Sequence, residues 1–245
     1  IFHPGNTVEL RFEKDSFKYK PGQYLFLNVP EVSSLQWHHF TLSSSPEEGF
    51  VSVHIRIVGD WTKKLADLLG CFEKGEVGVK APRIYIDGPY GAPAEDLYNY
   101  KAAILIGTGI GVTPAASLLK SVWYRYYRNA PMPLRKLYFF WINRDAEAFS
   151  WFQSLIASLE DTVPASQLEI HTYLTGNQSY DDIQNISMSH ADAVDPITEL
   201  KSRTHFGRPN WRSIFKAVQD FEKCQNGSIH ESDGLLDIGV FYCGP

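Results

Sequence analysis

The sequence changes its pattern near residue 101, and this change is the strongest constraint on the fold. Before it, short β-prone runs follow one another closely, separated by turn residues such as "KPG" at 20–22 and "APR" at 81–83. After it, apolar runs alternate with segments of helical periodicity. Closely spaced short strands are typical of an antiparallel barrel or sandwich, whereas alternating strands and helices indicate a parallel, doubly wound sheet. We therefore predict an antiparallel β-barrel domain at 1–95 and an α/β domain at 96–245.

One helix interrupts the β-prone runs of the first half. It is predicted within "GDWTKKLADLLG" at 59–70, where the apolar side chains fall on one helical face. Asp60 is placed to cap its start and Gly70 its end. The expected strands of this half are 7–12, 23–29, 38–44, 50–58 and 83–88.

The second half is expected to contain four apolar strands and three helices. The polar tracts 177–200 and 225–234 are predicted to be loops. The expected strands are 102–107, 136–142, 168–174 and 238–243, and the expected helices are 115–127, 146–160 and 211–223.

Composition excludes several classes of protein. With 44% hydrophobic and 21% charged residues the chain is typical of a globular protein, and a net charge of -5 argues against a nucleic-acid partner. Its three cysteines include no C-x-x-C pair, so neither a disulfide framework nor a metal site is predicted. No apolar run approaches the roughly 18 residues of a membrane helix. The cysteine pattern suits a reducing, cytosolic face. Because the chain starts at Ile1 rather than Met, we expect it to be part of a larger protein.

The stretch "LQWHHFTLSS" at 35–44 places two histidines and several hydroxyls in a β-prone run. Along a strand His38 and Phe40 point one way, whereas His39 and Thr41 point the other. Adjacent strand histidines therefore do not easily bind one metal. The serines that follow lack the G-x-S-x-G turn of an exposed nucleophile. A cofactor-binding strand and an ordinary strand remain open.

The stretch "GTGIGVTP" at 107–114 ends one predicted strand and opens a helix. Gly107, Gly109 and Gly111 permit a tight turn and close approach of the backbone, and Thr113 is placed to cap a helix that begins at Pro114. Such a helix start binds phosphate through free N–H groups. Val112 stands where a G-x-G-x-x-G motif has its third glycine, so a turn without a ligand is the alternative.

In a doubly wound sheet, ligands bind outside the carboxyl ends of the strands. Arg144, at the end of the second strand, suits the 2′-phosphate of NADPH, although it could instead pair with Asp145 or Glu147 on the surface. Arg208 is a second cationic candidate. The predicted strand ends are Gly107, 143–144, Thr175 with Gly176, and Cys243 with Gly244 and Pro245.

In the first half, His54 and Arg56 share a strand face that leads into the predicted helix at Trp61. A cation close to a helix N-terminus is an arrangement that binds a pyrophosphate. Solvated surface residues are the alternative.

Six motifs, in this order, resemble those of one family. They are "HHFTLSSSPEE", "HIRIVGDWT", "DGPYG", "GTGIGVTP", "GRPNW" and "FYCGP". Together they resemble the dehydrogenase domain of the NADPH oxidases, membrane flavocytochromes that make superoxide or hydrogen peroxide within a wider ferredoxin-reductase-like group. The resemblance spans essentially the whole chain. One departure is His39, where the family usually has proline.

The resemblance implies which residues bind the cofactors. Because alternation would not place both Phe40 and Thr41 on the flavin, a bend or backbone contacts are expected there. Cys243 would lie beside the nicotinamide as the catalytic residue. For FAD the implied residues are His38, Phe40, Thr41, His54, Arg56, Gly59, Trp61 and Thr62. For NADPH they are Gly107, Thr108, Gly109, Gly111, Val112, Thr113, Pro114, Arg144, Thr175, Gly176, Arg208, Cys243, Gly244 and Pro245.

The resemblance also implies an electron path: hydride from NADPH to FAD, then single electrons to haem and oxygen. The haem would belong to transmembrane helices upstream of Ile1, and a further helix with a carboxyl-terminal aromatic would follow Pro245. Expected partners are the protein's own transmembrane haem domain and regulatory cytosolic subunits or a calcium-binding module. A ferric-chelate reductase and a catalytically silent regulatory scaffold are the alternatives.

Overall fold

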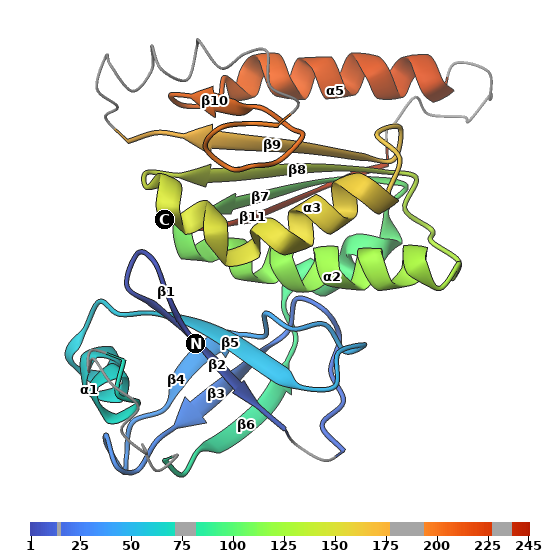
Figure 1. Ribbon diagram of the computed structural model, residues 1–245. Helices are drawn as coiled ribbons and strands as arrows, with labels where there is room; N and C mark the ends of the chain where they lie inside the picture. Colours follow the sequence, from blue (N-terminus) through green and yellow to red (C-terminus); the bar gives the residue numbers. More distant parts are fainter. Residues whose placement is uncertain (14–15, 72–81, 177–193, 227–236) are drawn as a thin grey trace.

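The computed structural model describes residues 1–13, 16–71, 82–176, 194–226 and 237–245. A β domain built from the first half of the chain lies beneath an α/β domain built from the second (Figure 1). Most of the two tracts predicted to be loops lies outside the described residues. None of the described helices is both long and apolar enough to cross a membrane.

The β domain consists of two three-stranded antiparallel sheets around one apolar core. The sheets are joined where Leu42 forms an isolated antiparallel bridge to Val53. The first sheet has the order β1-β2-β5, with β1 Phe2–His3, β2 Thr7–Phe12 and β5 Val51–Arg56. The second has the order β4-β3-β6, with β4 His38–Thr41, β3 Tyr24–Asn28 and β6 Tyr85–Tyr90.

Both faces of the β1-β2-β5 sheet are covered, which explains why polar side chains are buried in it. Val53 and Ile55 point into the core of the β domain. Alternation turns Glu9 and His54 to the other face, where they are 3% and 5% exposed. This face is covered by the α/β domain, because the ring of Phe152 lies 4.7 Å from that of His54.

Helix α1 (Asp60–Leu68) differs from the prediction at its start. The N-cap residue is Gly59, not Asp60, and the Thr62 hydroxyl accepts hydrogen bonds from the backbone N–H of Gly59 (3.0 Å) and of Val58 (3.1 Å). Thr62, at the third position of the helix, therefore bonds back to the N-cap backbone as in a capping box. Gly70 ends the helix as predicted, with a φ of +67° that glycine adopts without strain.

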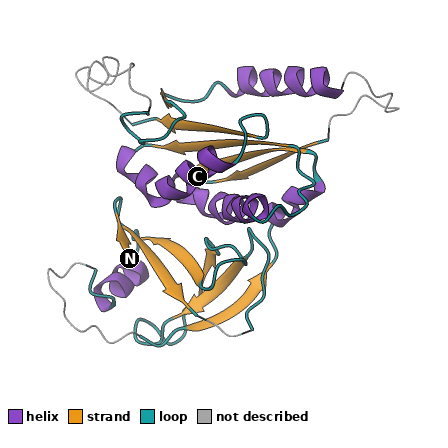
Figure 2. Cartoon of the chain, turned by 45° about the vertical axis from the view of Figure 1, so that its right-hand side comes forward, coloured by secondary structure: helices purple, strands orange, loops and turns teal. Residues whose placement is uncertain are grey.

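The α/β domain contains a parallel five-stranded sheet with helices on both faces (Figure 2). The strand order is β10-β9-β8-β7-β11. Strands β8 to β10 are added on one side of β7 and β11 on the other, so the topological switch point lies between β7 and β11. The strands are β7 Ala102–Thr108, β8 Lys136–Asn143, β9 Leu168–Leu174, β10 Thr204–Phe206 and β11 Ile238–Cys243. The predicted antiparallel domain followed by a doubly wound domain is thus confirmed.

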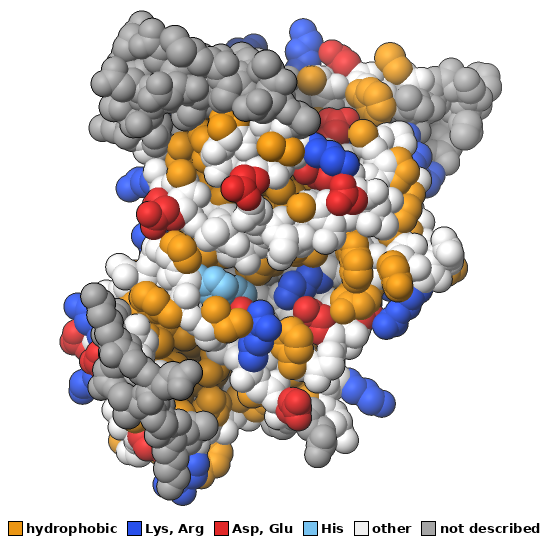
Figure 3. Space-filling model, in the orientation of Figure 1, with side chains coloured by type: hydrophobic (Ala, Val, Ile, Leu, Met, Phe, Trp, Pro, Cys, Tyr) orange, Lys and Arg blue, Asp and Glu red, His pale blue; other side chains and the backbone are white. Residues whose placement is uncertain are grey.

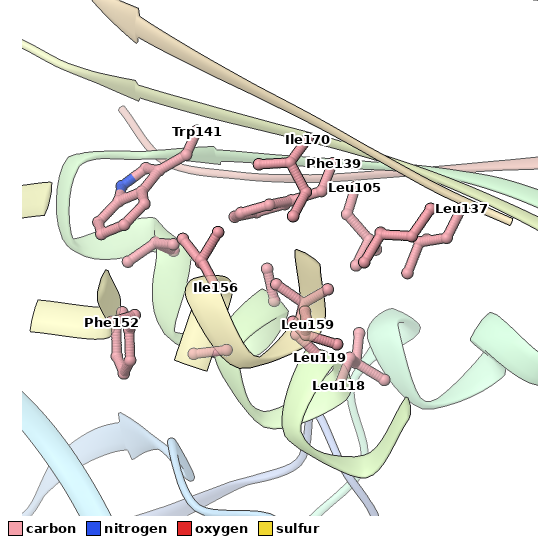
Figure 4. Close-up of a cluster of buried hydrophobic side chains, with 14 of the residues drawn as sticks. Leu105, Leu118, Leu119, Leu137, Phe139, Trp141, Phe152, Ile156, Leu159 and Ile170 are labelled. Atoms are coloured by element: carbon pink, nitrogen blue, oxygen red, sulfur yellow. The ribbon is translucent and has the colours of Figure 1, made fainter. Parts of the chain in front are cut away.

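One face of this sheet carries the larger apolar core. Leu105, Phe139 and Trp141 point from adjacent strands toward Ile156 and Leu159 of α3 (Figure 4). Helix α5 covers the opposite face through Val218 and its neighbours. Because β7 and β8 are buried on both sides, their sequences are almost continuously apolar. The helical segments are η1 Pro93–Asn99, η2 Gly109–Val112, α2 Thr113–Tyr127, η3 Ala146–Phe152, α3 Gln153–Thr162 and α5 Trp211–Asn226.

Two helix starts differ from the prediction. Helix α2 begins at Thr113, whose hydroxyl donates to the carbonyl oxygen of Ile110 at 3.2 Å instead of capping the helix. The segment predicted as one helix at 146–160 begins as the 3-10 helix η3 and becomes α-helical only at Gln153. In both places the predicted helical segment exists and its N-terminal part differs.

Candidate functional site

A cavity of about 610 Å³ lies between the two domains, beside the ends of β4, β7 and β11. From the β domain it is lined by Tyr24, His39 and Thr41, and from the α/β domain by residues that include Gly111 and Cys243. The cavity therefore brings the predicted flavin strand and the predicted nicotinamide residue to one place. Pro114, at the start of α2, also lines it.

The glycine turn after β7 is packed tightly against its neighbours at two positions and open at a third. A Cβ at Gly107 would lie 2.8 Å from the Cα of Val112, and one at Gly111 would collide with the carbonyl oxygen of Cys243. Gly109 has a φ of +54°, and apart from its neighbours along the chain no atom of the described residues lies within 4 Å of its Cβ position. The turn thus needs glycine for close backbone approach and leaves open space at Gly109.

The Thr108 hydroxyl is buried in this turn and has no hydrogen-bond partner among the described residues. It lies so close to Gly244 that a Cβ there would collide with it, and Gly244 has a φ of +150°. The ends of β7 and β11 are therefore in contact at the switch point of the sheet.

The ends of β8 and β9 also meet. The backbone N–H of Thr175 donates to the carbonyl oxygen of Asn143 at 2.8 Å, and a Cβ at Gly176 would collide with the carbonyl oxygen of Arg144. Arg144 is exposed, and it forms no ion pair with Asp145 or Glu147 within the part of the chain that the structure describes. The surface-pairing alternative for Arg144 is thus not realised.

Arg208 lies just beyond β10, at the same edge of the sheet. It is exposed and follows Gly207, whose φ is +82°. Two strands separate the end of β10 from that of β7, since the order is β10-β9-β8-β7. The structure therefore places both candidate arginines, Arg144 and Arg208, along the row of carboxyl strand ends.

Strand β4 is regular, and this corrects the expected bend. Its pairing with β3 continues without a register shift from Leu27–His38 to Tyr24–Thr41. His39 and Thr41 face the cavity, whereas the rings of His38 and Phe40 lie 4.2 Å and 6.1 Å from that of Trp61. His39, the residue that replaces the proline usual in the resembling family, therefore lines the cavity, and Phe40 does not.

The side chains around the start of α1 leave buried polar atoms unpaired. His38 Nε2 and Trp61 Nε1 are buried without a hydrogen-bond partner among the described residues. Burial, with a smaller effect of His39, lowers the pKa of His38, so its imidazole is favoured in the neutral form. Arg56 and Gly59 are exposed beside them. A polar ligand would supply the missing partners.

His54 lies apart from the other candidate residues. Its ring is buried between His3, at 5.3 Å, and Phe152, and it does not line the cavity. Strand alternation predicted correctly that it shares a face with Arg56, but that face is covered by the second domain at His54 and open at Arg56.

Sequence reasoning did not identify the aromatic residues next to His39. The rings of Tyr24 and Phe26 each lie 5.6 Å from that of Tyr90, and they lie 6.3 Å and 6.1 Å from that of His39. In "YLFL" at 24–27 every residue is apolar or aromatic, so the sequence does not show which face is outward.

Comparison with known proteins identifies both domains. Residues 1–94 match the family described as FAD-binding domain, and residues 100–245 match the ferric reductase NAD binding domain. These matches confirm the predicted cofactor classes, a flavin for the first domain and a nicotinamide dinucleotide for the second. A ferredoxin NADP+ reductase from Neisseria gonorrhoeae, solved with FAD and NADP, has the same fold at 16% identity, with a TM-score of 0.54 over 97% of this chain and 93% of that one.

Sequence relatives define the family more narrowly. The chain is 44% identical to NADPH oxidase 3 of Rattus norvegicus over 251 residues, covering 100% of this chain and 42% of the relative. It is also 44% identical to a heavy chain of the superoxide-generating NADPH oxidase of Dictyostelium discoideum, covering 99% and 47%. The chain thus spans less than half the length of these relatives. It belongs to the ferric reductase family of NAD-binding domains and, with its FAD-binding domain, corresponds to the dehydrogenase region of the NADPH oxidases.

Proposed function

We propose that this chain transfers hydride from NADPH to FAD. The observation that carries the proposal is the interdomain cavity, in which His39 and Thr41 of the predicted flavin strand face the same space as Cys243 and the glycine turn. Hydride transfer requires the two rings to be held in contact, which a cavity shared by both binding domains permits. FAD, when bound, supplies the chemistry that divides an electron pair into single-electron steps.

The residues fit FAD at the face of β4 and the start of α1. His39 and Thr41 would orient the ring system, and the aromatic residues beside His39 would exclude water from it. Arg56 and the backbone N–H groups in the first turn of α1 would bind the pyrophosphate, because a helix N-terminus and a guanidinium both favour an anion. The unpaired His38 Nε2 supports a polar ligand on this side. We assign His54, Phe40, Trp61 and Thr62 to positioning these groups.

The residues also fit NADPH at the carboxyl ends of the strands. Gly107, Thr108, Gly109 and Gly111, followed by Val112, Thr113 and Pro114, would receive the pyrophosphate in the open space at Gly109. Thr175 and Gly176 would contact the adenosine half, and Arg144 with Arg208 would bind its 2′-phosphate. Cys243, Gly244 and Pro245 would lie beside the nicotinamide, with Cys243 as the catalytic residue.

In the whole protein we propose that electrons continue to haem and oxygen, forming superoxide or hydrogen peroxide. Its transmembrane haem domain and regulatory subunits would then be partners, with this region on the cytosolic face of a membrane. We place the boundary between the two domains at residues 95 and 96, within η1. The family description keeps a ferric-chelate acceptor as the second candidate. A catalytically silent scaffold is disfavoured by the intact glycine turn.

NADPH consumption with an artificial electron acceptor, measured with and without added FAD, tests this proposal. We expect turnover that depends on FAD. Arg56→Ala should weaken FAD binding more than NADPH binding, because one charge-assisted phosphate contact contributes about 1.5–3 kcal/mol. FAD-independent turnover, or no turnover with saturating FAD, would refute the assignment.

A further inference from the structure

Three potential metal ligands meet on the side of the β domain that faces the α/β domain. One ligand atom each of His3, Glu9 and His54 lies within 4.8 Å of the others. They come from three strands, β1, β2 and β5, and this cluster is separate from the proposed cofactor cavity.

Strand register explains why these side chains meet. Glu9 is paired directly with His54 across the antiparallel β2 and β5, and His3 is paired with Thr7 across β1 and β2. Directly paired residues share a face, and so do residues two apart along a strand. The three side chains therefore project from one face of one sheet, on a rigid backbone.

His54 is arranged as a metal ligand is. Its side chain is 95% buried, its Nδ1 lies 2.7 Å from the Ser43 hydroxyl, and its buried Nε2 has no partner among the described residues. Metal-bound histidines use one ring nitrogen for the metal and the other for an orienting hydrogen bond.

Glu9 supplies an ionised oxygen at the same place. The Arg11 guanidinium pairs with this carboxylate, and Arg11 Nε donates to Glu9 Oε1 at 2.7 Å. His3 Nε2 lies 3.2 Å from Glu9 Oε2 and Arg11 Nη2 lies 2.9 Å from the same oxygen. A carboxylate has about four lone-pair positions, so one remains for a cation.

We propose that His3, Glu9 and His54 bind a divalent transition-metal ion of the zinc class. Two imidazoles and one carboxylate are a donor set that suits such an ion, and a fourth position opens toward an adjoining cavity of about 460 Å³. The buried His54 Nε2, which has no partner among the described residues, is the nitrogen that would bind the ion. Figure 3 shows a histidine among acidic and basic side chains at the furrow between the two domains.

The positive charge around the cluster limits the ions that fit. Arg11 contacts Glu9 directly, and Lys120, which pairs with Glu48 at 3.1 Å, also faces this cavity. Both cations repel a metal ion, so neutral imidazole nitrogens must provide most of the binding. This favours Zn²⁺ over Mg²⁺, because Mg²⁺ prefers oxygen ligands.

A bound ion would connect the two domains indirectly. Next to His3, the carbonyl oxygen of Pro4 accepts a hydrogen bond from Trp151 Nε1 at 2.8 Å, and Phe152 packs on His54. Binding would therefore fix β1 and β5 against η3. The expected result is a melting temperature that rises with Zn²⁺ and falls when a chelator is added.

Zinc titration of the metal-free chain tests the site, with bound metal counted by elemental analysis after dialysis. We expect one Zn²⁺ per chain in the wild type, and at least a ~10-fold weaker affinity after Glu9→Gln, after His54→Gln, or after Ser43→Ala, which removes the orienting hydrogen bond. The matched control is His171→Gln, which removes another histidine beside a glutamate, at 3.6 Å from Glu169, and should keep wild-type affinity. No uptake by the wild type, or equal uptake by His54→Gln, would overturn the proposal.

Anomalous scattering at the zinc edge from crystals of the wild-type chain soaked in Zn²⁺ locates the ion without any variant. A peak among the imidazoles and the carboxylate of His3, Glu9 and His54 supports the site. Peaks only at other residues, such as the exposed thiols of Cys224 or Cys243, would overturn it even if zinc raised the melting temperature.

Discussion

The Ser117 hydroxyl, on helix α2, donates a hydrogen bond of 2.6 Å to the carbonyl oxygen of Ser44, in the segment that follows strand β4. Both residues are fully buried. Because α2 begins at the glycine turn and β4 carries His39 and Thr41, this bond fixes the two halves of the proposed site relative to each other. Lys120 and Ser121 reinforce it through Glu48 at 3.1 Å and Glu47 at 2.9 Å.

Ser117→Ala should lower the free energy of unfolding by about 1–3 kcal/mol, because the buried Ser44 carbonyl loses its partner. It should also slow flavin reduction by NADPH, while FAD affinity stays near that of the wild type. Denaturant unfolding and rapid-mixing kinetics measure the two effects. Ser158→Ala, which removes a hydroxyl that donates to the Ser154 carbonyl oxygen within α3 at 2.8 Å, is the control and should change neither. Wild-type kinetics in Ser117→Ala would show that this contact does not align the site.

Arg144→Ala should lower kcat/KM for NADPH by roughly 10- to 150-fold while leaving the value for NADH nearly unchanged. The two nucleotides differ by one phosphate, and a charge-assisted contact to it is worth about 1.5–3 kcal/mol. The same change at the exposed Arg212 should have no effect on either nucleotide. An equal loss for both nucleotides in Arg144→Ala would make this residue structural. Adding Arg208→Ala should bring the kcat/KM values for NADPH and NADH closer still, although the effects of two groups that bind one phosphate are not additive.

Gly111→Ala should abolish most NADPH binding but leave FAD binding intact. The new methyl group collides with the Cys243 carbonyl oxygen, so the end of β11 must move, at a cost of about 1–3 kcal/mol in stability. Gly49→Ala is the matched control, because its Cβ position has no atom of the described residues within 4 Å other than those of its chain neighbours. Calorimetric titration with NADP⁺ and with FAD separates the two sites. Retained NADP⁺ affinity in Gly111→Ala would argue against nucleotide binding at this turn.

The metal-free chain should lose stability as the pH falls from about 6.5 to about 3, because His54 takes up a proton more readily in the unfolded chain. Burial lowers the pKa of His54 to about 3, so between these values the unfolded chain binds a proton there that the folded chain does not. The slope from this one group is at most about 1.4 kcal/mol per pH unit. Unfolding curves measured with a chelator should show a smaller slope for His54→Gln. Equal slopes in both proteins would show that His54 titrates normally when folded.

The sequence predicts strands and sheet class well because alternation and apolar runs carry the signal. Strands β2, β9 and β11 have the predicted bounds. The two-residue β1 and three-residue β10 are missed, since pairing with a neighbour, not local pattern, defines such short strands. Residues 177–193 and 227–236, mostly predicted to be loops, lie outside the described part of the chain.

Within the site, local motifs predict which segments matter, but not which side chains face the cavity. The glycine turn and the arginines are found from sequence because strand ends of a parallel sheet lie on one edge. His39 facing the cavity, and His54 lying under Phe152, depend on how the domains pack. The cluster of His3 and Glu9 with His54 is invisible in sequence for the same reason, because pairing of distant strands brings it together.

Anaerobic mixing of the FAD-loaded chain with NADPH tests the central claim most directly. The absorbance of oxidised flavin should disappear as NADPH is consumed in equal amount, and NADH should cause the same change more slowly. Flavin that stays bound and oxidised with excess NADPH would contradict the account, since the two binding domains would then not form one site for hydride transfer.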